Sequence, residues 1–204
     1  MTNESSYSAA ARLNRPLVMN FANAHKAGGG FLLGANAQEE ALCRCSTLYA
    51  SINSGVAKKM YRYNNTHISR IESDYMLLSP EVAVFRGDDL SLLEEPYTVG
   101  VITLPAPNRH GAAALTSKKT ISEVILRRIE IMLRAAAKTG YRELVLGAWG
   151  CGAFGNDPNS VAEQFRKALM DERLGQCFRR VVFAVYGRPD GRNITAFRNV
   201  FEVR

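Results

Sequence analysis

Short runs of mostly apolar residues recur along this chain, and most of them are followed by a stretch with helical periodicity. The runs are residues 17–21, 82–85, 99–104, 144–146 and 181–186. Continuous apolar strands that alternate with helices are typical of a mostly parallel sheet buried on both faces. The sequence therefore predicts an α/β fold in three layers, a mixed and mostly parallel sheet with helices on both sides.

Four helices are predicted around these strands from apolar spacing and capping signals. They are residues 37–51, a long helix from a Thr120–Glu123 capping box to Gly140, a helix that begins at Asp157-Pro158, and residues 193–201. Residues 54–79 and 105–117 are the least regular stretches, and we expect them to be loops.

The length and composition indicate one globular unit. With 204 residues, and about 150 residues as the usual domain size, we expect a single domain over residues 1–204. Hydrophobic residues make up 47% and charged residues 22%, which excludes a disordered or coiled-coil chain. No apolar run approaches the ~20 residues that cross a bilayer, and the first eight residues are polar. We expect a cytoplasmic protein without membrane contact.

The cysteines and histidines do not have the spacing of a metal site. The four cysteines form no Cys-x-x-Cys pair, and the three histidines are scattered. We expect reduced thiols, no bound metal and no cofactor. The formal net charge is +7, which attracts anionic partners, but the basic residues occur only in short pairs. A nucleic-acid-binding protein is therefore the least favoured functional hypothesis, and no direct nucleic-acid partner is expected.

Two glycine-rich turns follow predicted strands, Gly28–Gly30 and the segment from Gly147 to Gly155. Ligands of parallel α/β sheets bind at the carboxyl ends of strands, and free amides at helix N-termini favour anions. Two such turns favour a pyrophosphate held from two sides over glycines that serve only as tight turns. The dinucleotide fingerprint does not follow the first strand and the Gly-Lys-Ser/Thr motif is missing, so hydride transfer and ATP hydrolysis are disfavoured.

Three polar residues, Gln38, Glu39 and Glu40, open the helix after the first glycine turn. Acidic residues at this position can simply complement the helix dipole. Neighbouring helical residues point about 100° apart, however, so the two glutamates cannot both face solvent or both face one reacting atom, and we expect one of them to face the cleft. A carboxyl near a bound diphosphate has its pKa raised towards the range of a general acid, whereas the helix N-terminus lowers it. The sequence leaves open which effect is larger.

These segments together resemble the macrodomain-type poly(ADP-ribose) glycohydrolases, most closely the microbial branch. The resemblance covers about residue 14 to the C-terminus, and its most specific part is the Gly-Gly-Gly turn followed by Gln-Glu-Glu. The segments that carry it are Asn20-Phe21-Ala22-Asn23, Gly28-Gly29-Gly30, Gln38-Glu39-Glu40, residues 79–86, residues 105–108 and residues 147–156. The resemblance implies a macrodomain-like fold and, as substrate, the terminal ADP-ribose of poly(ADP-ribose), carried on ADP-ribosylated proteins.

The resemblance also implies roles for individual residues. Glu40 would be the catalytic acid that protonates the leaving ribose oxygen and then assists the attacking water. Glu39 would hydrogen-bond the ribose hydroxyls beside the scissile bond, and Asn23 would bind the distal ribose. The remaining ligand-binding residues would be Gly28, Gly29 and Gly30 of the catalytic loop, Gln38, and Gly150, Cys151, Gly152, Ala153 and Phe154 of the second diphosphate loop, with Phe154 near the distal ribose.

Phe154 has an alternative role, since an aromatic side chain in a glycine loop can anchor that loop to the core. The microbial relatives usually carry a longer segment before the first strand, whereas only 19 residues precede Asn20 here. The first functional hypothesis is a glycohydrolase, either exo- or endo-acting. The alternative is a protein without this activity, either a module that binds ADP-ribose without cleaving it or a truncated, inactive relative. In either case we expect a monomer.

Overall fold

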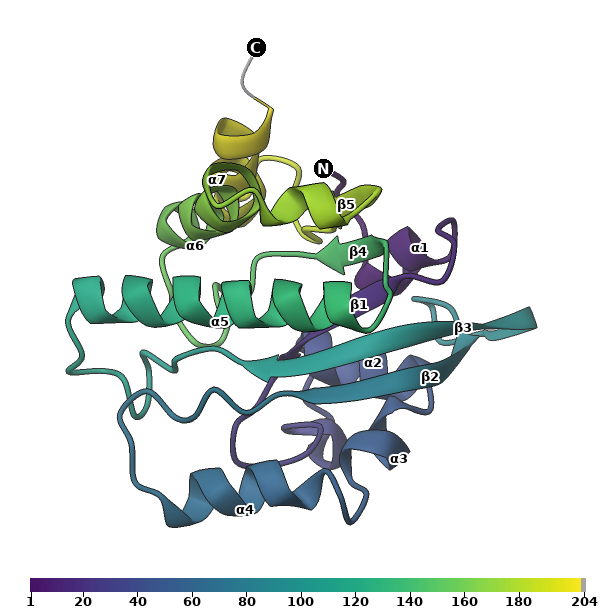
Figure 1. Cartoon of the computed structure of the whole chain (residues 1–204). Coiled ribbons are helices and arrows are strands. Elements are labelled where there is room, and N and C mark those ends of the chain that lie inside the picture. The colour runs from purple at the N-terminus through teal and green to yellow at the C-terminus, as the bar shows by residue number, and fades with distance from the viewer. Residues whose placement is uncertain (203–204) are drawn as a thin grey trace.

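The computed structural model describes residues 1–202. Its centre is a five-stranded sheet in the order β2-β3-β1-β4-β5 (Figure 1). The strands are β1 (Leu17–Ala22), β2 (Leu77–Arg86), β3 (Leu92–Pro105), β4 (Glu143–Leu146) and β5 (Arg180–Phe183). Strand β2 is antiparallel to β3, and the other neighbours pair in parallel. The predicted α/β class and mostly parallel sheet are confirmed.

Helices cover both faces of this sheet (Figure 1). The face towards the viewer carries α5 (Lys118–Lys138), α6 (Pro158–Arg166) and α7 (Arg192–Phe201). The other face carries α1 (Ser6–Ala10), α2 (Gln38–Cys45) and α3 (Leu48–Ile52), and α4 (Lys58–Thr66) lies beyond β2. Three short turns of helix complete the chain: η1 (Phe31–Leu33), the π-helical η2 (Lys167–Asp171) and η3 (Leu174–Cys177).

The alternation of side chains along each strand divides the core into two layers. On β1, Leu17 and Met19 pack with the cluster beneath α5 and α6, whereas Val18 packs with the cluster beneath α2 and α3. Asn20 is two residues beyond Val18, so it points towards α2 and is fully buried. The sheet thus presents one buried polar side chain to the helix that carries the two glutamates.

The predicted helix over residues 37–51 is two helices, α2 and α3, and this expectation was wrong. Ser46 is extended at the break and forms an antiparallel bridge with Val84, and the Thr47 N–H donates to the Ala83 carbonyl at 3.0 Å. The Ser46 hydroxyl then accepts from the Leu48 N–H at 3.1 Å and starts the second helix. Pairing with β2 therefore outcompetes helix continuation.

The assignment of residues 54–79 to a loop was also wrong, because this stretch contains α4 and the beginning of β2. Only three residues of α4 are buried, namely Met60, Tyr61 and Asn64. They lie at positions i, i+1 and i+4, on one face of a helix that is otherwise polar. The loop over residues 105–117 is confirmed except for Pro105, which ends β3.

The capping prediction for α5 was wrong by one turn. The N-cap is Ser117, whose hydroxyl accepts from the Thr120 N–H at 3.1 Å, and not Thr120. The predicted signals at Gly140 and Asp157 are confirmed. Gly140 follows the C-cap with φ of +84°, and Asp157 caps α6 by accepting from the Ser160 N–H.

Strand β5 is shorter than predicted and ends at Phe183, although the Ala184 N–H still donates to the Leu146 carbonyl of β4 at 2.8 Å. Thr2 forms a parallel bridge with Ala184: the Thr2 N–H donates to the Phe183 carbonyl at 2.9 Å, and the Thr2 carbonyl accepts from the Val185 N–H at 3.0 Å. The N-terminal residues and the chain that leaves β5 are thereby held side by side, next to the carboxyl end of β4.

Candidate functional site

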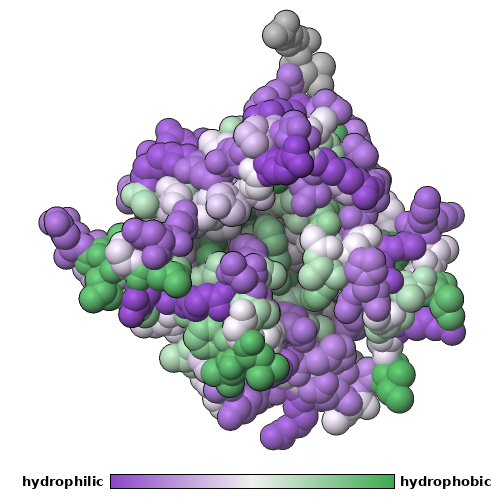
Figure 2. All heavy atoms as spheres, turned by 180° about the vertical axis from the view of Figure 1, so that it is seen from behind, coloured by the Kyte–Doolittle hydropathy of each residue, from purple (hydrophilic) through white to green (hydrophobic). Residues whose placement is uncertain are grey.

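A cavity of about 520 Å³ lies at the carboxyl ends of β1 and β4. Its walls are the end of β1, the loop around Gly29, the start of α2, residues 148–154, residues 184–186 and the N-terminal residues 4–7. The surface turned away from the viewer of Figure 1 is hollowed near its centre (Figure 2). This is the position that ligands occupy in parallel α/β sheets, and both glycine-rich segments reach it.

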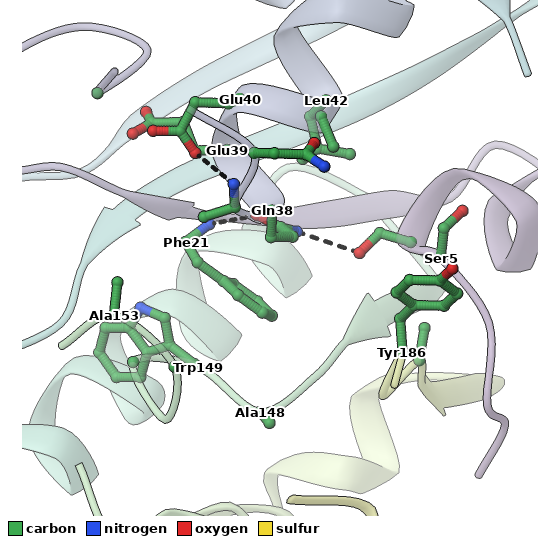
Figure 3. Close-up of a pocket in the computed structure, with 18 of the residues that line it drawn as sticks. Ser5, Phe21, Gln38, Glu39, Glu40, Leu42, Ala148, Trp149, Ala153 and Tyr186 are labelled. Atoms are coloured by element: carbon green, nitrogen blue, oxygen red, sulfur yellow. Dashed lines mark hydrogen bonds between the residues drawn. The ribbon is translucent and has the colours of Figure 1, made fainter. Parts of the chain in front are cut away.

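Glu39 and Glu40 both line this cavity and both are buried, with 3% and 7% of their surface exposed. Figure 3 shows the two carboxyl groups near each other, with Trp149 and Ala153 across the cavity. The expectation that both could not face solvent is confirmed. The structure differs from the expectation that one of them faces the cleft, because both carboxyl groups border the cavity.

The Glu39 carboxyl group is held by hydrogen bonds from β1 and from the loop that follows it. Its Oε1 accepts from Asn20 Nδ2 at 3.3 Å, and its Oε2 accepts from the Asn23 N–H at 2.8 Å. Burial raises the pKa of Glu39 to about 7, while the bonds from Asn23 and Asn20 act in the opposite direction. The nearby Glu40 carboxyl adds a smaller upward contribution to this pKa. Glu39 can therefore change its charge near neutral pH.

Glu40 is held by two backbone groups. Its Oε1 accepts from the Gly30 N–H at 2.9 Å, and its Oε2 accepts from the Ala37 N–H at 3.1 Å. The second bond is half of a capping box, since Ala37 has no side-chain acceptor to complete it. Each carboxylate oxygen has two lone pairs, so each keeps one that is free for a ligand.

The glycine loop fits closely around the Glu40 carboxyl. A Cβ atom on Gly29 would lie 2.5 Å from Glu40 Oε1, and Gly29 has φ of +53°. Both the space and the backbone conformation therefore require glycine at this position. Gly28, with φ of +68°, instead packs against the Tyr49 ring, where a Cβ atom would lie 2.8 Å from Cδ2.

The Gln38 side chain connects α2 to the sheet by hydrogen bonds. Its Oε1 accepts from the Phe21 N–H at 2.9 Å, and its Nε2 donates to the Met19 carbonyl at 2.8 Å and to the Ser6 hydroxyl at 3.1 Å. Two of these bonds go to β1 backbone groups. Gln38 thus fixes the start of α2, and with it the two glutamates, to the end of β1.

The second glycine segment is held by Asn156, which is 2% exposed. Its Nδ2 donates to the Pro107 carbonyl at 2.9 Å and to the Gly150 carbonyl at 3.1 Å. The Arg109 N–H also donates to the Phe154 carbonyl at 2.9 Å. The Trp149 side chain is buried beneath this segment and donates to the Leu104 carbonyl at 3.0 Å. Loop 105–117 therefore supports the turn that carries Phe154.

Most of the predicted site residues meet in this one cavity. The lining includes Asn23, Gly29, Gly30, Gln38, Glu39, Glu40, Gly150, Gly152, Ala153 and Phe154. Gly28 and Cys151 lie outside the lining. Burial raises the pKa of the Cys151 thiol to about 12, so the thiol remains neutral, and its Sγ lies 3.5 Å from the Trp149 carbonyl oxygen.

Part of the wall was not predicted from the sequence, above all Tyr186, Phe21 and the N-terminal Ser5 and Ser6. Tyr186 is 80% exposed and stands across the cavity from Gln38 (Figure 3). It follows β5, so the rule that sites form beyond the carboxyl ends of strands could have found it. No comparable signal marks the N-terminal residues, because the tertiary pairing of Thr2 brings them to the site.

Comparisons with solved structures place this geometry in a known family. Over 98% of the chain, the structure resembles a mutant poly(ADP-ribose) glycohydrolase from Deinococcus radiodurans in complex with ADP-ribose, with 39% identity, a TM-score of 0.92 and 82% of that chain covered. The chain belongs to the poly(ADP-ribose) glycohydrolase family. The corresponding enzyme from Thermomonospora curvata, bound to the inhibitor ADP-HPD, has 44% identity and a TM-score of 0.92, with 98% of this chain and 77% of that chain covered.

The family model that matches is the microbial-type PARG catalytic domain, over residues 1–87. This segment contains β1, the glycine loop and both glutamates. None of the curated proteins matches the chain. The predicted family and macrodomain-like fold of the poly(ADP-ribose) glycohydrolases are thus confirmed. Within residues 1–202, no helix is both long and apolar enough to cross a membrane, and no three His, Cys, Asp or Glu side chains form a group that could hold a metal ion.

Proposed function

We propose that this protein hydrolyses the ribose–ribose O-glycosidic bonds of poly(ADP-ribose) and releases ADP-ribose, with Glu40 as the general acid and base. The observation that carries the proposal is the position of the buried Glu39–Glu40 pair, which lies against the Gly29–Gly30 loop in a cavity bordered by two glycine-rich turns. The relatives of known structure are glycohydrolases that bind ADP-ribose or an inhibitor in crystals.

The proposed reaction needs one carboxyl group that donates and then accepts a proton. Glu40 would give its proton to the ribose oxygen that leaves the anomeric carbon, and the bond between that carbon and oxygen would break. The resulting carboxylate would then take a proton from the water that attacks the oxocarbenium-like centre, which regenerates the acid. Ordinary glycosidases place two carboxyl groups on opposite sides of the bond. The side-by-side pair here fits a single acid and base better.

Glu39, Asn23 and the glycine loops would position the substrate for this step. Glu39 would accept hydrogen bonds from the ribose hydroxyls, and Asn23 would bind the distal ribose. The Asn23 Oδ1 already accepts from the His25 and Lys26 N–H groups, so its Nδ2 is the group that can face a sugar. A diphosphate held between the two glycine turns would stabilise the developing positive charge at the anomeric carbon.

The other properties of the protein are proposed on the same basis. We expect a single domain over residues 1–204 that acts as a monomer in the cytoplasm, on polymer attached to ADP-ribosylated proteins, without a cofactor or metal. Neither a membrane nor a nucleic acid is among the proposed partners.

One observation favours the alternative, a protein that binds ADP-ribose without cleaving it. Both carboxylate oxygens of Glu40 accept backbone hydrogen bonds, from Gly30 and Ala37, which is a sufficient structural reason for a glutamate at this position. In this case Glu40 would only hold the loop to the helix.

The two functions are separated by incubation of the protein and its Glu40→Gln variant with poly(ADP-ribose), with free ADP-ribose as the measured product. We expect release by the parent protein and a loss of about 100- to 10,000-fold in the variant, the usual contribution of a general acid. Binding of ADP-ribose by both proteins without release by either would establish the binding module instead.

A further inference from the structure

Three aromatic side chains form a platform at the end of α4. The rings of Tyr63 and His67 stack, with their centroids 4.0 Å apart and their planes at 10° to each other. The Tyr75 ring is tilted against the Tyr63 ring, with 5.3 Å between the two centroids. Tyr63 is 40% and Tyr75 42% exposed, and His67 is also exposed. Half-exposed rings of this kind present flat faces on which a planar base can stack.

Helix α4, which carries Tyr63 at its end, is connected to the rim of the candidate site by the side chain of Asn65. Asn65, on the same turn of α4, donates from Nδ2 to the His25 carbonyl at 3.0 Å, and its Oδ1 lies 2.9 Å from His25 Nδ1. The His25 N–H in turn donates to Oδ1 of Asn23 at 2.8 Å. Since Asn23 lines the cavity and its N–H binds Glu39, helix α4, which carries Tyr63, lies next to the wall that holds the glutamates.

Three exposed basic residues lie close in sequence to the platform rings or to His25. Arg62 precedes Tyr63 on α4, Arg70 follows His67 in the next loop, and Lys26 follows His25, and all three are exposed. Within residues 1–202 none of these three cations forms an ion pair with a carboxylate. The nearby Asp74, in contrast, is neutralised by Arg127 and Arg128. The surface therefore combines exposed rings with positive charge that has no internal partner.

Part of this arrangement has a purely structural reason. The His67 ring nitrogen Nδ1 lies 3.0 Å from the Tyr63 carbonyl and from the Thr66 hydroxyl, which closes the end of α4. This explains why His67 is held against Tyr63. It does not explain why Tyr75 adds a third ring at the surface, or why the exposed residues close to the rings in sequence are cationic.

We infer that Tyr63, His67 and Tyr75, with Lys26, Arg62 and Arg70, form an outer subsite for the second ADP-ribose unit of the polymer, the unit that carries the leaving ribose hydroxyl. This inference rests on the proposed function. When the terminal unit fills the cavity, the leaving ribose is beside Glu40 and Glu39, and the next unit must continue past the cavity rim. That unit offers an adenine, which stacks on aromatic rings, and a diphosphate, which arginine and lysine side chains bind.

The outer subsite would increase affinity for polymer without contributing to the binding of free ADP-ribose, which has no second unit. The test measures binding in the Glu40→Gln background, in which the polymer is not consumed. Fluorescence anisotropy would give the Kd of a polymer of about 20 units, and calorimetry the Kd of ADP-ribose. The variants are Tyr63→Ala with Tyr75→Ala, the matched ring-retaining pair Tyr63→Phe with Tyr75→Phe, and Arg62→Gln with Arg70→Gln. The charge control is Arg134→Gln with Lys138→Gln, two exposed cations on α5.

We expect the alanine pair and the arginine pair each to weaken polymer binding about tenfold, with the Kd of ADP-ribose unchanged. The phenylalanine pair and the α5 control should bind polymer as the parent does. An unchanged polymer Kd in the alanine and arginine pairs would overturn the inference. An equal loss for ADP-ribose in the arginine pair, which alters only exposed side chains, would also overturn it.

Two further outcomes keep this test separate from the proposed function. If the parent protein binds polymer but releases no ADP-ribose, the proposed hydrolysis fails while the binding data still decide the subsite. If the parent binds a poly(A) RNA of equal length as tightly as the polymer, and the same variants weaken both, the surface is a general nucleic-acid surface and the inference is wrong.

Discussion

The side-chain amide of Asn20 joins the two sheet strands β1 and β3 to Glu39. Its Nδ2 lies 3.3 Å from Glu39 Oε1 and 3.1 Å from the hydroxyl oxygen of Thr103, the residue opposite Asn20 in the sheet. All three side chains are buried. A hydrogen bond donated to a carboxylate favours its charged form, so Asn20 opposes the effect of burial on Glu39.

We predict that Asn20→Ala moves the pH optimum of ADP-ribose release upwards. Loss of the donated bond raises the pKa of Glu39 further above its value of about 7, so the charged form appears only at higher pH. A bond worth about 1 kcal/mol corresponds to a shift of about 0.7 pH units. The measurement is a pH–rate profile of both proteins.

Thr103→Val is the control for this profile, because it removes the other partner of the same amide without touching Glu39. Its optimum should move less than that of Asn20→Ala. A reduced rate at an unchanged optimum in Asn20→Ala would show that the amide does not set the protonation of Glu39.

Glu39 should also make the stability of the protein depend on pH. Its pKa in the folded state, about 7, lies above the value of 4.5 expected for an unfolded chain, so the folded protein binds more protons between these values. The free energy of unfolding contributed by this group is therefore highest below pH 4.5 and falls as the pH rises to 7. The full difference amounts to about 3 kcal/mol.

Urea unfolding of the protein and of Glu39→Gln at pH 5, 6.5 and 8 checks this sign. Relative to the parent, the variant should gain stability as the pH rises, because glutamine has no charge to desolvate. Asn20 can adapt to the new amide, since its buried Oδ1 lacks a partner and a flipped side chain would accept from the glutamine. A constant difference between the two proteins at the three pH values would contradict the assigned pKa.

Gly29→Ala should abolish most of the activity through Glu40. The added Cβ would lie 2.5 Å from Glu40 Oε1, so the carboxyl group must move away from the loop, and φ of +53° adds backbone strain. We expect a fall of at least about 100-fold in kcat, the minimum for loss of a positioned general acid. Steady-state kinetics on poly(ADP-ribose) gives this value.

Gly34→Ala separates strain from displacement of the carboxyl group. Gly34 has φ of +80°, similar in sign to Gly29, but a Cβ atom there meets nothing within 4 Å. This variant should lose about 1 kcal/mol of stability and retain its kcat. An equal loss of kcat in both variants would mean that the flexibility of the loop, and not the position of Glu40, limits the reaction.

The site was predictable where chemistry is local to one segment. The glycine turns and the Gln38–Glu40 run each follow or precede a recognisable element, and the rule for parallel sheets then brings them to one edge. The break at Ser46 was not predictable, because its cause is pairing with Val84, a residue 38 positions away. Helix α4 was not predictable either. Only two of its three buried residues are apolar, so the sequence shows little of the apolar periodicity that marks a helix. Tertiary contacts also place Ser5 and Ser6 at the cavity, which no local pattern indicates.

The second glycine segment offers a test of its own through Asn156→Asp. Asn156 donates from Nδ2 to two carbonyl groups, those of Pro107 and Gly150, while it is 2% exposed. An aspartate has the same shape but cannot donate when ionised, so its oxygens would face two acceptors in a buried position. We expect the free energy of unfolding to fall by about 2–4 kcal/mol and the affinity for ADP-ribose to fall with it, because the turn at Gly150 loses its support.

Asn159→Asp is the matched control, because it adds the same charge three residues away on the exposed start of α6. A negative charge in the first turn of a helix is favourable, so this variant should be as stable as the parent. Urea unfolding and calorimetry with ADP-ribose measure the two quantities. If Asn156→Asp lowers stability but leaves the Kd of ADP-ribose unchanged, the second glycine turn does not hold the ligand, and only the loop around Gly29 remains as the candidate anion site.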